Sequence, residues 1–179
     1  MTIEERCDRR DQINLVLLAD HGEAVNGTER LWHTTYVGPE VVRVPWLIRV
    51  PGLAPSTVNA AIGLSDVTPT LLDLLGLTPP EDFAGRSALE LVGVAKPGFG
   101  PPIIALETRE WSILDGDRRL RYSPYSRALS LHDVTADPAE QRDLSALEPE
   151  RAAALRGALL AAVRTIERQN GRLRFGYDH

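Results

Sequence analysis

An apolar run that ends in a short polar stretch constrains the fold of this chain most. Residues 13–19 read INLVLLA and are followed directly by Asp20-His21-Gly22-Glu23. A short, largely unalternating apolar run closed by a glycine is typical of a strand buried on both faces of a mainly parallel sheet. In open α/β folds, ligands bind at the carboxyl ends of such strands. We therefore predict a buried strand with polar side chains at its carboxyl end.

The next two segments extend this pattern to an α/β arrangement. Residues 41–50 form a second apolar run, in which Pro45 marks the start of the strand proper because proline cannot donate a ladder hydrogen bond. Ser65-Asp66 then precedes apolar residues at helical spacing, and Gly76 follows them. This is the order of an N-cap, a helix and a C-terminal glycine. Strand, loop, strand and helix in succession indicate an α/β layer structure.

The remainder of the chain has a different pattern. Residues 77–102 are rich in proline and glycine and are predicted to form a long surface connection. Short strands are expected after it, with a hairpin turn at 115–117, and residues 149–170 have the apolar spacing of a helix. We therefore divide the chain into an α/β domain at 1–100 and, at 101–179, a small antiparallel sheet plus a helix. The expected strands are residues 103–106, 111–114, 119–122 and 129–134.

Composition excludes several functional classes. The single cysteine, Cys7, rules out an internal disulfide, and the net charge of −5 argues against nonspecific nucleic-acid binding. No stretch approaches the roughly 18 consecutive apolar residues of a membrane span. The first ten residues lack the apolar region of a secretory signal, so the sequence as written predicts a cytoplasmic protein. A longer form would be compatible with the periplasm or with secretion.

Asp20 and His21 are the best candidates for a metal site. A carboxylate and an imidazole in adjacent positions can both reach one divalent cation if the strand end turns sharply, and Gly22 would allow that turn. Spacing alone favours a plainer interpretation, because a dipeptide is a weak signal. In that interpretation Asp20 caps a helix and His21 is a solvated loop residue.

Longer stretches resemble a known family in their order along the chain. NLVLLADHGE, WHTTY, VVRVPWLIRVPG, LSDVTPTLLDLLGL and GRSALEL resemble the downstream half of a sulfatase catalytic domain, of the alkaline phosphatase superfamily. LSLHDVTADPAEQRDLS is similar to the pattern L-Y-D-L-x-x-D-P-x-E-x-x-N-L of that family's C-terminal subdomain. The resemblance spans roughly residues 12–148. It implies the downstream half of an alkaline-phosphatase-like sandwich, with a small C-terminal antiparallel sheet and helix.

The resemblance also implies roles for individual residues. Asp20 would be a metal ligand, and His21 a ligand or a contact to the anionic ester. Calcium is usual in sulfatases and suits carboxylate ligands, whereas an imidazole leaves manganese or zinc open. His33 falls where relatives place a group that contacts the ester oxygens or protonates the leaving group. The alternative for His33 is a packed loop histidine beside Trp32, and Glu23 is expected to form hydrogen bonds within its loop.

Other polar residues are expected to be structural. Asp66 is interpreted as a helix cap, and His132, where relatives usually have tyrosine, as a packing residue. The arginines of the predicted hairpin are expected on a solvated face, because the chain is acidic overall. Arg43 is expected to be a solvated residue at a strand edge. The hairpin arginines are Arg118, Arg119 and Arg121.

The family's nucleophile is not in this sequence. Sulfatases carry it as a Cys or Ser in Cys/Ser-x-Pro-x-Arg, near an upstream Asp-Asp metal pair, and Cys7 lacks that context. We therefore expect the isolated chain to be inactive. Three hypotheses follow: the C-terminal part of a sulfate-ester hydrolase, a short chain completed by a separately encoded N-terminal chain, or a non-catalytic binding or regulatory module. The retained Asp20-His21-Gly22 favours the first two, with phosphate, phosphodiester and phosphonate esters as alternative substrates.

Overall fold

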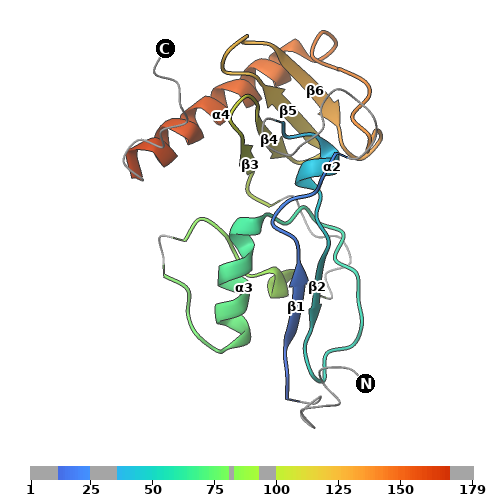
Figure 1. Ribbon diagram of the computed structural model, residues 1–179, viewed down its shortest axis with the longest axis vertical. Helices are drawn as coiled ribbons and strands as arrows, with labels where there is room; N and C mark the ends of the chain where they lie inside the picture. Colours follow the sequence, from blue (N-terminus) through green and yellow to red (C-terminus); the bar gives the residue numbers. More distant parts are fainter. Residues whose placement is uncertain (1–11, 25–35, 81–82, 93–99, 170–179) are drawn as a thin grey trace. The chain divides into compact units, whose positions relative to one another are not determined.

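A computed structural model describes residues 12–24, 36–80, 83–92 and 100–169 of the chain (Figure 1). By its internal contacts the chain forms two compact units. Unit 1 comprises residues 1–20 and 44–98, and unit 2 comprises residues 21–43 and 99–179. Residues 21–43 thus belong with the second half of the sequence in this division. The two domains at 1–100 and 101–179 remain a prediction from the sequence pattern.

Unit 1 contains a two-stranded antiparallel sheet. Strand β1 (Leu15–Leu18) pairs with β2 (Trp46–Arg49), and Leu17 lies opposite Leu47. The second strand begins directly after Pro45, as predicted. The prediction of a mainly parallel sheet is wrong for the described residues, because β1 has an antiparallel partner there. An apolar run shows that a strand has apolar faces, but the direction of its neighbour is set by tertiary structure.

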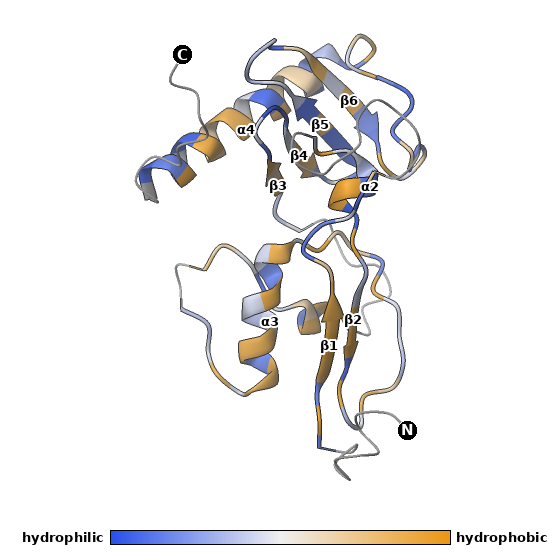
Figure 2. Cartoon of the chain, in the orientation of Figure 1, coloured by the Kyte–Doolittle hydropathy of each residue, from blue (hydrophilic) through white to orange (hydrophobic). Residues whose placement is uncertain are grey.

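The two faces of β1 differ in exposure. Leu15 and Leu17 are 50% and 59% exposed, whereas Val16 and Leu18 between them are half-buried. The expectation that both faces are buried is therefore wrong within the described part of the chain. Successive side chains of a strand point to opposite faces, so the exposed leucines share one face. Strand β1 is hydrophobic along its length (Figure 2), whereas β2 ends in Arg49.

The helical part of unit 1 is held together by a buried carboxylate. It consists of η1 (Leu64–Asp66), α3 (Val67–Leu74) and η2 (Ala88–Leu91). Asp66 accepts hydrogen bonds from the backbone N–H groups of Gly63 and Arg86, both at 2.9 Å. Its structural role is confirmed, but its side chain does not cap α3. It closes the turn of η1 and joins that turn to the segment before η2.

Thr70 and Gly85 complete this connection. The Thr70 hydroxyl donates to the Asp66 carbonyl at 2.6 Å and accepts from the Ala88 N–H at 2.8 Å. A Cβ at residue 85 would overlap the backbone of Ser65, so only glycine allows this approach. The stretches LSDVTPT and GRSAL, which are separate in the sequence, therefore form one hydrogen-bonded structure.

Unit 2 is built on a four-stranded antiparallel sheet in the order β3-β4-β5-β6. All four strands, the Gly116 turn (φ +67°) and the terminal helix follow the sequence prediction. The short helix α2 was not predicted, since part of its sequence was assigned to a strand. No helix in the described part of the chain is long and apolar enough to cross a membrane. The elements are β3 (Ile103–Leu106), β4 (Trp111–Asp115), β5 (Arg118–Tyr122), β6 (Leu129–Asp133), α2 (Pro39–Val42) and α4 (Pro149–Gln169).

The two faces of the unit 2 sheet are chemically distinct. Leu120 and Leu131 are fully buried in an apolar core with Leu159 of α4. Arg119 and Arg121 alternate with Leu120 along β5 and so lie on the opposite face. Both arginines are buried, at 6% and 9% exposure, which makes the predicted solvated face wrong for them. Figure 2 shows β5 as the hydrophilic strand of this sheet.

Candidate functional site

Asp20 and His21 follow β1 directly, as the sequence predicts. Both residues are exposed, and the chain passes from unit 1 to unit 2 between them. The Nδ1 atom of His21 lies 2.9 Å from the carbonyl oxygen of Gly22. In the tautomer that donates this hydrogen bond, Nε2 is the nitrogen that can bind a metal. A carbonyl acceptor for the other ring nitrogen is the usual support of a metal-binding histidine.

Gly22 is required by close packing rather than by an unusual backbone angle. Its N–H donates a 2.7 Å hydrogen bond to the carbonyl oxygen of Val41 in α2. A Cβ at residue 22 would overlap the carbonyl oxygen of Glu40. The polar stretch after β1 therefore packs against α2 and forms a hydrogen bond with it. Residue 22 thus lies next to a segment almost twenty residues further along the chain.

The described residues provide only part of a metal coordination shell. Among residues 12–24, 36–80, 83–92 and 100–169, no group of three or more histidine, cysteine or acidic side chains could hold a metal ion. Asp20 and His21 offer a carboxylate and an imidazole, which fit calcium, manganese or zinc as donor types. A cation at this pair would need further ligands from outside the described residues, because calcium takes about six to eight oxygen ligands.

His33 lies outside the described residues, as do Trp32 and Cys7, so the structure does not test their predicted roles. The residues just after this region are described and are held by unit 2. The backbone N–H of Val37 donates to Glu110 Oε2 at 3.0 Å. The guanidinium carbon of Arg121 lies 4.4 Å from the centre of the Tyr36 ring.

Glu110 and Arg121 form a hydrogen-bonded ion pair at this point. Arg121 Nη2 donates to both carboxylate oxygens of Glu110, at 3.0 and 2.9 Å. Burial acts to lower the pKa of the Arg121 guanidinium, but the Glu110 carboxylate and Tyr36 outweigh it and raise that pKa. Arg121 therefore remains charged despite its burial.

A second buried ion pair lies on the same face of the sheet. Arg119 Nη1 is 3.0 Å from Glu140 Oε1, and the Glu140 side chain has no exposed surface. Arg43 approaches the same carboxylate at 4.0 Å and is 41% exposed, so it is only partly solvated. Burial lowers the pKa of Arg119, while Glu140 opposes that shift. Glu140 lies in the ADPAEQRDL stretch of the family-like pattern, which could have marked it as a structural residue.

His132 is a packing residue, as predicted. It is 4% exposed, with Nδ1 3.0 Å from the Arg142 carbonyl oxygen and Nε2 2.9 Å from the Ser130 hydroxyl. Arg118, in contrast to its two neighbours on β5, lies nearer the rim. Its guanidinium donates to Glu148 at 3.0 Å and to Asp133 at 2.7 Å. The three hairpin arginines thus all have carboxylate partners.

One family model and several curated proteins match parts of this chain. The Sulfatase family model matches residues 5–77. The ulvan-active sulfatase of Formosa agariphila is 34% identical over 82 residues, which cover 44% of this chain and 16% of that protein. A 2,3-bisphosphoglycerate-independent phosphoglycerate mutase of Thermomicrobium roseum is 36% identical over 89 residues, 46% of this chain and 16% of the mutase. The chain therefore spans about one sixth of the length of these relatives.

Solved structures show the fold over most of the chain. A 2-O GAG sulfatase gives a TM-score of 0.68 at 20% identity, over 85% of this chain and 36% of that one. A phosphonate monoester hydrolase of Agrobacterium radiobacter gives 0.72 at 19% identity, over 90% of this chain and 37% of that one. The mixed α/β fold with antiparallel sheets is thus that of a part of the sulfatase structure.

Proposed function

We propose that this chain, whose residues 5–77 match the Sulfatase family model, supplies a C-terminal part of a sulfatase-family hydrolase that cleaves sulfate esters at a divalent-metal site. The observation that carries the proposal is the family match over the segment that contains Asp20-His21-Gly22. These residues directly follow β1 and are exposed. The carboxylate and imidazole at this position support a metal role more strongly than a cap, because the match extends far beyond the dipeptide.

The proposed roles follow from the donor types. Asp20 Oδ atoms and His21 Nε2 would be ligands of the cation, with Ca²⁺ preferred and Mn²⁺ or Zn²⁺ as alternatives. His21 would alternatively contact the anionic ester. When bound, the cation would polarise the ester oxygens. His33 would contact those oxygens or give a proton to the leaving group, because an imidazole exchanges protons near neutral pH.

We further propose that the exposed leucines of unit 1 pack against more of the catalytic domain. Leu17 and Leu47 are cross-strand neighbours, 59% and 58% exposed, and Leu15 lies on the same face of β1. Exposed apolar patches of this kind are typical of interaction surfaces. The matching solved chains contain more than twice as much polypeptide as the region they share with this chain. The complementary part would come from the same polypeptide or from a separately encoded chain.

Hydrolysis of phosphonate or phosphate esters is the second candidate. It is favoured by the likeness to the phosphonate monoester hydrolase and by the match to the phosphoglycerate mutase. Sulfate monoesters carry one negative charge and phosphate monoesters about two near neutral pH. Phosphate monoesters therefore differ from sulfate monoesters in the charge that the site has to accommodate, whereas phosphonate monoesters carry one negative charge, like sulfate monoesters, and differ in the atom that is attacked. An assay with both ester classes separates the two candidates.

The first experiment is mass spectrometry of the protein purified from its natural source, with peptide coverage. Peptides that contain Cys/Ser-x-Pro-x-Arg, on the same polypeptide or on a copurifying chain, would support the hydrolase. The same preparation is then assayed with 4-nitrophenyl sulfate and with 4-nitrophenyl phenylphosphonate. A preparation without such peptides, and without turnover of either ester, would favour a non-catalytic binding module.

The metal assignment is tested with a pair of neighbouring acidic residues. In the assembled enzyme, Asp20→Ala should abolish turnover and reduce the bound metal, measured by elemental analysis. Glu23→Gln removes a negative charge three residues away and should retain most of the activity, because Glu23 has no proposed metal role. Near-normal turnover by Asp20→Ala would refute the assignment of Asp20 as a ligand.

A further inference from the structure

The sheet of unit 2 is linked to the polar stretch after β1 through the short helix α2. Glu110 and Arg121 of the sheet contact the residues just before α2, and α2 in turn accepts a hydrogen bond from Gly22. We propose that Glu110 and Arg121 are positioning residues for the His21 imidazole, and that they act through α2 and the Gly22 backbone. All of these residues belong to unit 2. That the positioned ring binds a metal rests on the proposed function.

The first link joins the sheet to the segment before α2. Arg121 Nη2 donates to both oxygens of Glu110, which orients the carboxylate, and Glu110 Oε2 accepts the backbone N–H of Val37 at 3.0 Å. The Arg121 guanidinium also covers the Tyr36 ring at 4.4 Å, within the range of a cation–π interaction. Glu110 is itself held in a turn, because its carbonyl oxygen accepts the Glu107 N–H at 3.0 Å. One charged pair of the sheet therefore binds two consecutive residues.

The second link is α2 itself, which begins directly after Gly38. The Gly38 carbonyl oxygen accepts the N–H groups of Val41 and Val42, both at 3.0 Å. A Cβ at residue 38 would overlap the Tyr36 ring, and since the φ angle of −67° suits any residue, glycine is needed for space alone. Val37 and Val41 are buried. The segment from Val37 to Val42 is therefore one compact, hydrogen-bonded piece.

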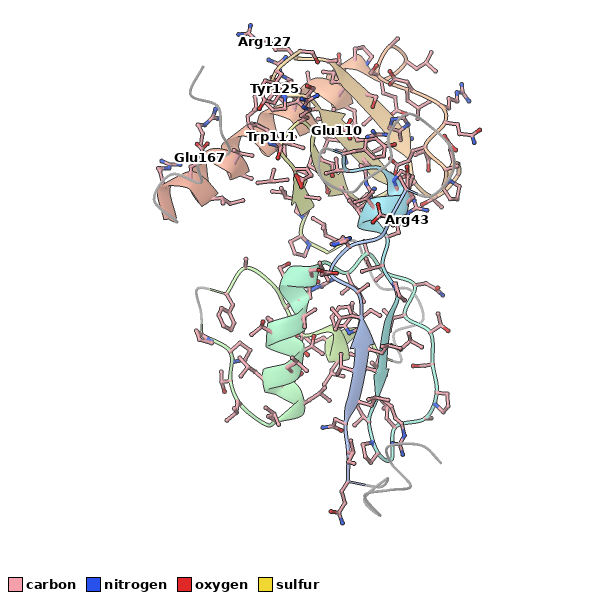
Figure 3. The ribbon with its side chains drawn as sticks, viewed as in Figure 1. Arg43, Glu110, Trp111, Tyr125, Arg127 and Glu167 are labelled. Atoms are coloured by element: carbon pink, nitrogen blue, oxygen red, sulfur yellow. The ribbon has the colours of Figure 1, made fainter. Side chains whose placement is uncertain are left out.

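The other end of α2 also faces the charged side of the sheet. Arg43 directly follows α2 and lies 4.0 Å from Glu140, the ion-pair partner of Arg119. Figure 3 labels Arg43 at the end of α2 and Glu110 just before β4. The two buried ion pairs of the sheet thus contact the two ends of the same helix. A helix of four residues is too short to be stable alone, so its position depends on such contacts.

The third link passes from α2 to His21. The Gly22 N–H donates to the Val41 carbonyl oxygen at 2.7 Å, and a Cβ at residue 22 would overlap the carbonyl oxygen of Glu40. The Gly22 backbone is therefore held against α2. Its own carbonyl oxygen lies 2.9 Å from His21 Nδ1. Because a carbonyl oxygen can only accept, this hydrogen bond requires the proton of the neutral ring on Nδ1 and leaves the lone pair on Nε2.

The chemistry of the Glu110–Arg121 pair indicates positioning rather than general stability. Removing an arginine and a glutamate from water is costly, and apolar residues of similar size often stabilise a fold as well or better. A charged pair does, however, impose direction, since the carboxylate must face both the guanidinium and the Val37 N–H. His21 is exposed, so core packing does not orient its ring, and the Gly22 carbonyl oxygen gives the ring a direction. Loss of such a partner typically lowers the metal affinity of a histidine site about 10–100-fold.

The first test uses the full chain and needs neither metal nor activity. Glu110→Gln should speed amide hydrogen exchange about tenfold at Val37, which loses a charged acceptor, and at least about threefold at Gly22. Glu148→Gln is the matched control and should leave both rates unchanged. It breaks the Arg118 ion pair of the same sheet, and none of the described interactions of Glu148 involves α2. Equal rates in the two variants, or faster exchange at Val37 alone, would overturn the link through α2.

The second test reads the His21 ring in the full chain, from the ¹⁵N chemical shifts of its two nitrogens in mildly basic solution, where a histidine is ordinarily neutral. Comparison with His21→Gln assigns the signals. The proton should lie on Nδ1 in the wild type, whereas both tautomers should be populated in Glu110→Gln. Gly38→Ala should give the same result by displacing the Tyr36 ring, which keeps the test decisive if Glu110→Gln folds poorly. A proton that stays on Nδ1 in both variants would overturn the positioning of His21.

The third test uses the assembled enzyme, with Ca²⁺ alone as the probe and equilibrium dialysis as the measurement. Glu110→Gln should weaken Ca²⁺ binding about tenfold, because the ligand nitrogen of His21 is no longer held in place. In a His21→Ala background the same substitution should have almost no further effect. An undiminished effect in that background would overturn action through His21. A changed His21 tautomer in an assembly that binds no Ca²⁺, Mn²⁺ or Zn²⁺ and hydrolyses no ester would support the positioning and reject the proposed function instead.

Discussion

The sheets of the two units differ in how completely their apolar faces are covered. In unit 2, α4 covers one face of the sheet with apolar side chains, and charged pairs fill the other face. In unit 1, one face of the β1–β2 pair exposes Leu15, Leu17 and Leu47 by half or more. Both sheets have side chains that alternate between faces as strand geometry requires. The difference indicates that the sequence of unit 2 contains its own covering elements, whereas one apolar face of the β1–β2 pair in unit 1 stays exposed.

The two units also use different polar chemistry in their interiors. Asp66 of unit 1 is satisfied by backbone N–H groups, which come from its own turn and from the segment before η2. In unit 2, Arg119 and Arg121 face Glu140 and Glu110 instead. A carboxylate bound to backbone stabilises one local connection. An arginine–glutamate pair joins side chains of distant segments, and it is costly to break because an unpaired charge stays buried.

The largest loss of stability is expected from a substitution on the face of the unit 2 sheet that α4 covers. Leu120→Ala in unit 2 should reduce the free energy of unfolding by about 3–4 kcal/mol, because it leaves a cavity at a fully buried position. The matched change Leu17→Ala in unit 1 should cost less than about 1 kcal/mol, because that side chain is 59% exposed. Urea unfolding of the two variants, followed by circular dichroism, makes the comparison. A cost for Leu17→Ala as large as that for Leu120→Ala would mean that the leucine face is covered in solution.

The second largest loss of stability is expected on the opposite face of the same sheet, where Arg119 and Glu140 form an ion pair. Glu140→Gln should destabilise unit 2 by about 3 kcal/mol, because it leaves the Arg119 guanidinium buried without a counter-charge. Adding Arg119→Met should recover part of the loss, since the unpaired charge is then removed. The comparison is again made by urea unfolding. A double variant that is less stable than Glu140→Gln alone would show that Arg119 contributes mainly through packing of its stem.

Much of unit 2 could be predicted from local patterns. Leu120 lies between two arginines, and Asp115-Gly116-Asp117 separates two short strands, so strand, turn and register follow from residues close in sequence. The burial of Arg119 and Arg121 could not be predicted in the same way. Their partners include Glu140 and Tyr36, and nothing in the local pattern shows that such distant groups meet them.

The candidate site was predicted to a similar extent. Asp20 was correctly placed directly after a strand, because the end of an apolar run is a local signal. The sequence predicts that Gly22 allows a sharp turn, whereas the structure requires glycine because residue 22 packs against the backbone of Glu40 and Val41 in α2, a helix that the local pattern does not indicate. The metal role of Asp20 and the role of His33 stay predictions.

A smaller effect is expected at the polar centre of unit 1. Asp66→Asn should cost about 1–2 kcal/mol, because an amide oxygen can replace only one of the two charge-assisted bonds to backbone N–H groups. The loss should be local, so amide hydrogen exchange at Gly63 and Arg86 is the appropriate measurement. Thr68→Ala, a change of an exposed residue in the adjoining helix α3, is the control. Faster exchange throughout unit 2 in the Asp66 variant would contradict a local role.

The smallest expected effect is the loss of unit 2 stability at acidic pH that comes from the carboxylates around Arg118, Glu148 and Asp133. The Arg118 hydrogen bond lowers the pKa of the Glu148 carboxyl, and the Ala136 N–H and Arg118 lower that of Asp133. These groups bind fewer protons in the folded chain than in the unfolded chain, so their stabilisation is present above the unfolded pKa of about 4 and is lost as pH falls through the lowered values. Unfolding measured between neutral and acidic pH should show this loss below about pH 4. Glu148→Gln should flatten the acid response, whereas Glu150→Gln, two residues further along the chain and without a contact to Arg118 among the described interactions, should leave it unchanged. An equal acid response in wild type and Glu148→Gln would exclude the Arg118 ion pairs as its cause. Carboxylates bound by backbone N–H groups would then be the next candidates. At Asp143, for example, burial raises the pKa of the carboxyl, but hydrogen bonds from the Leu131 and Ser145 N–H groups outweigh burial and lower that pKa.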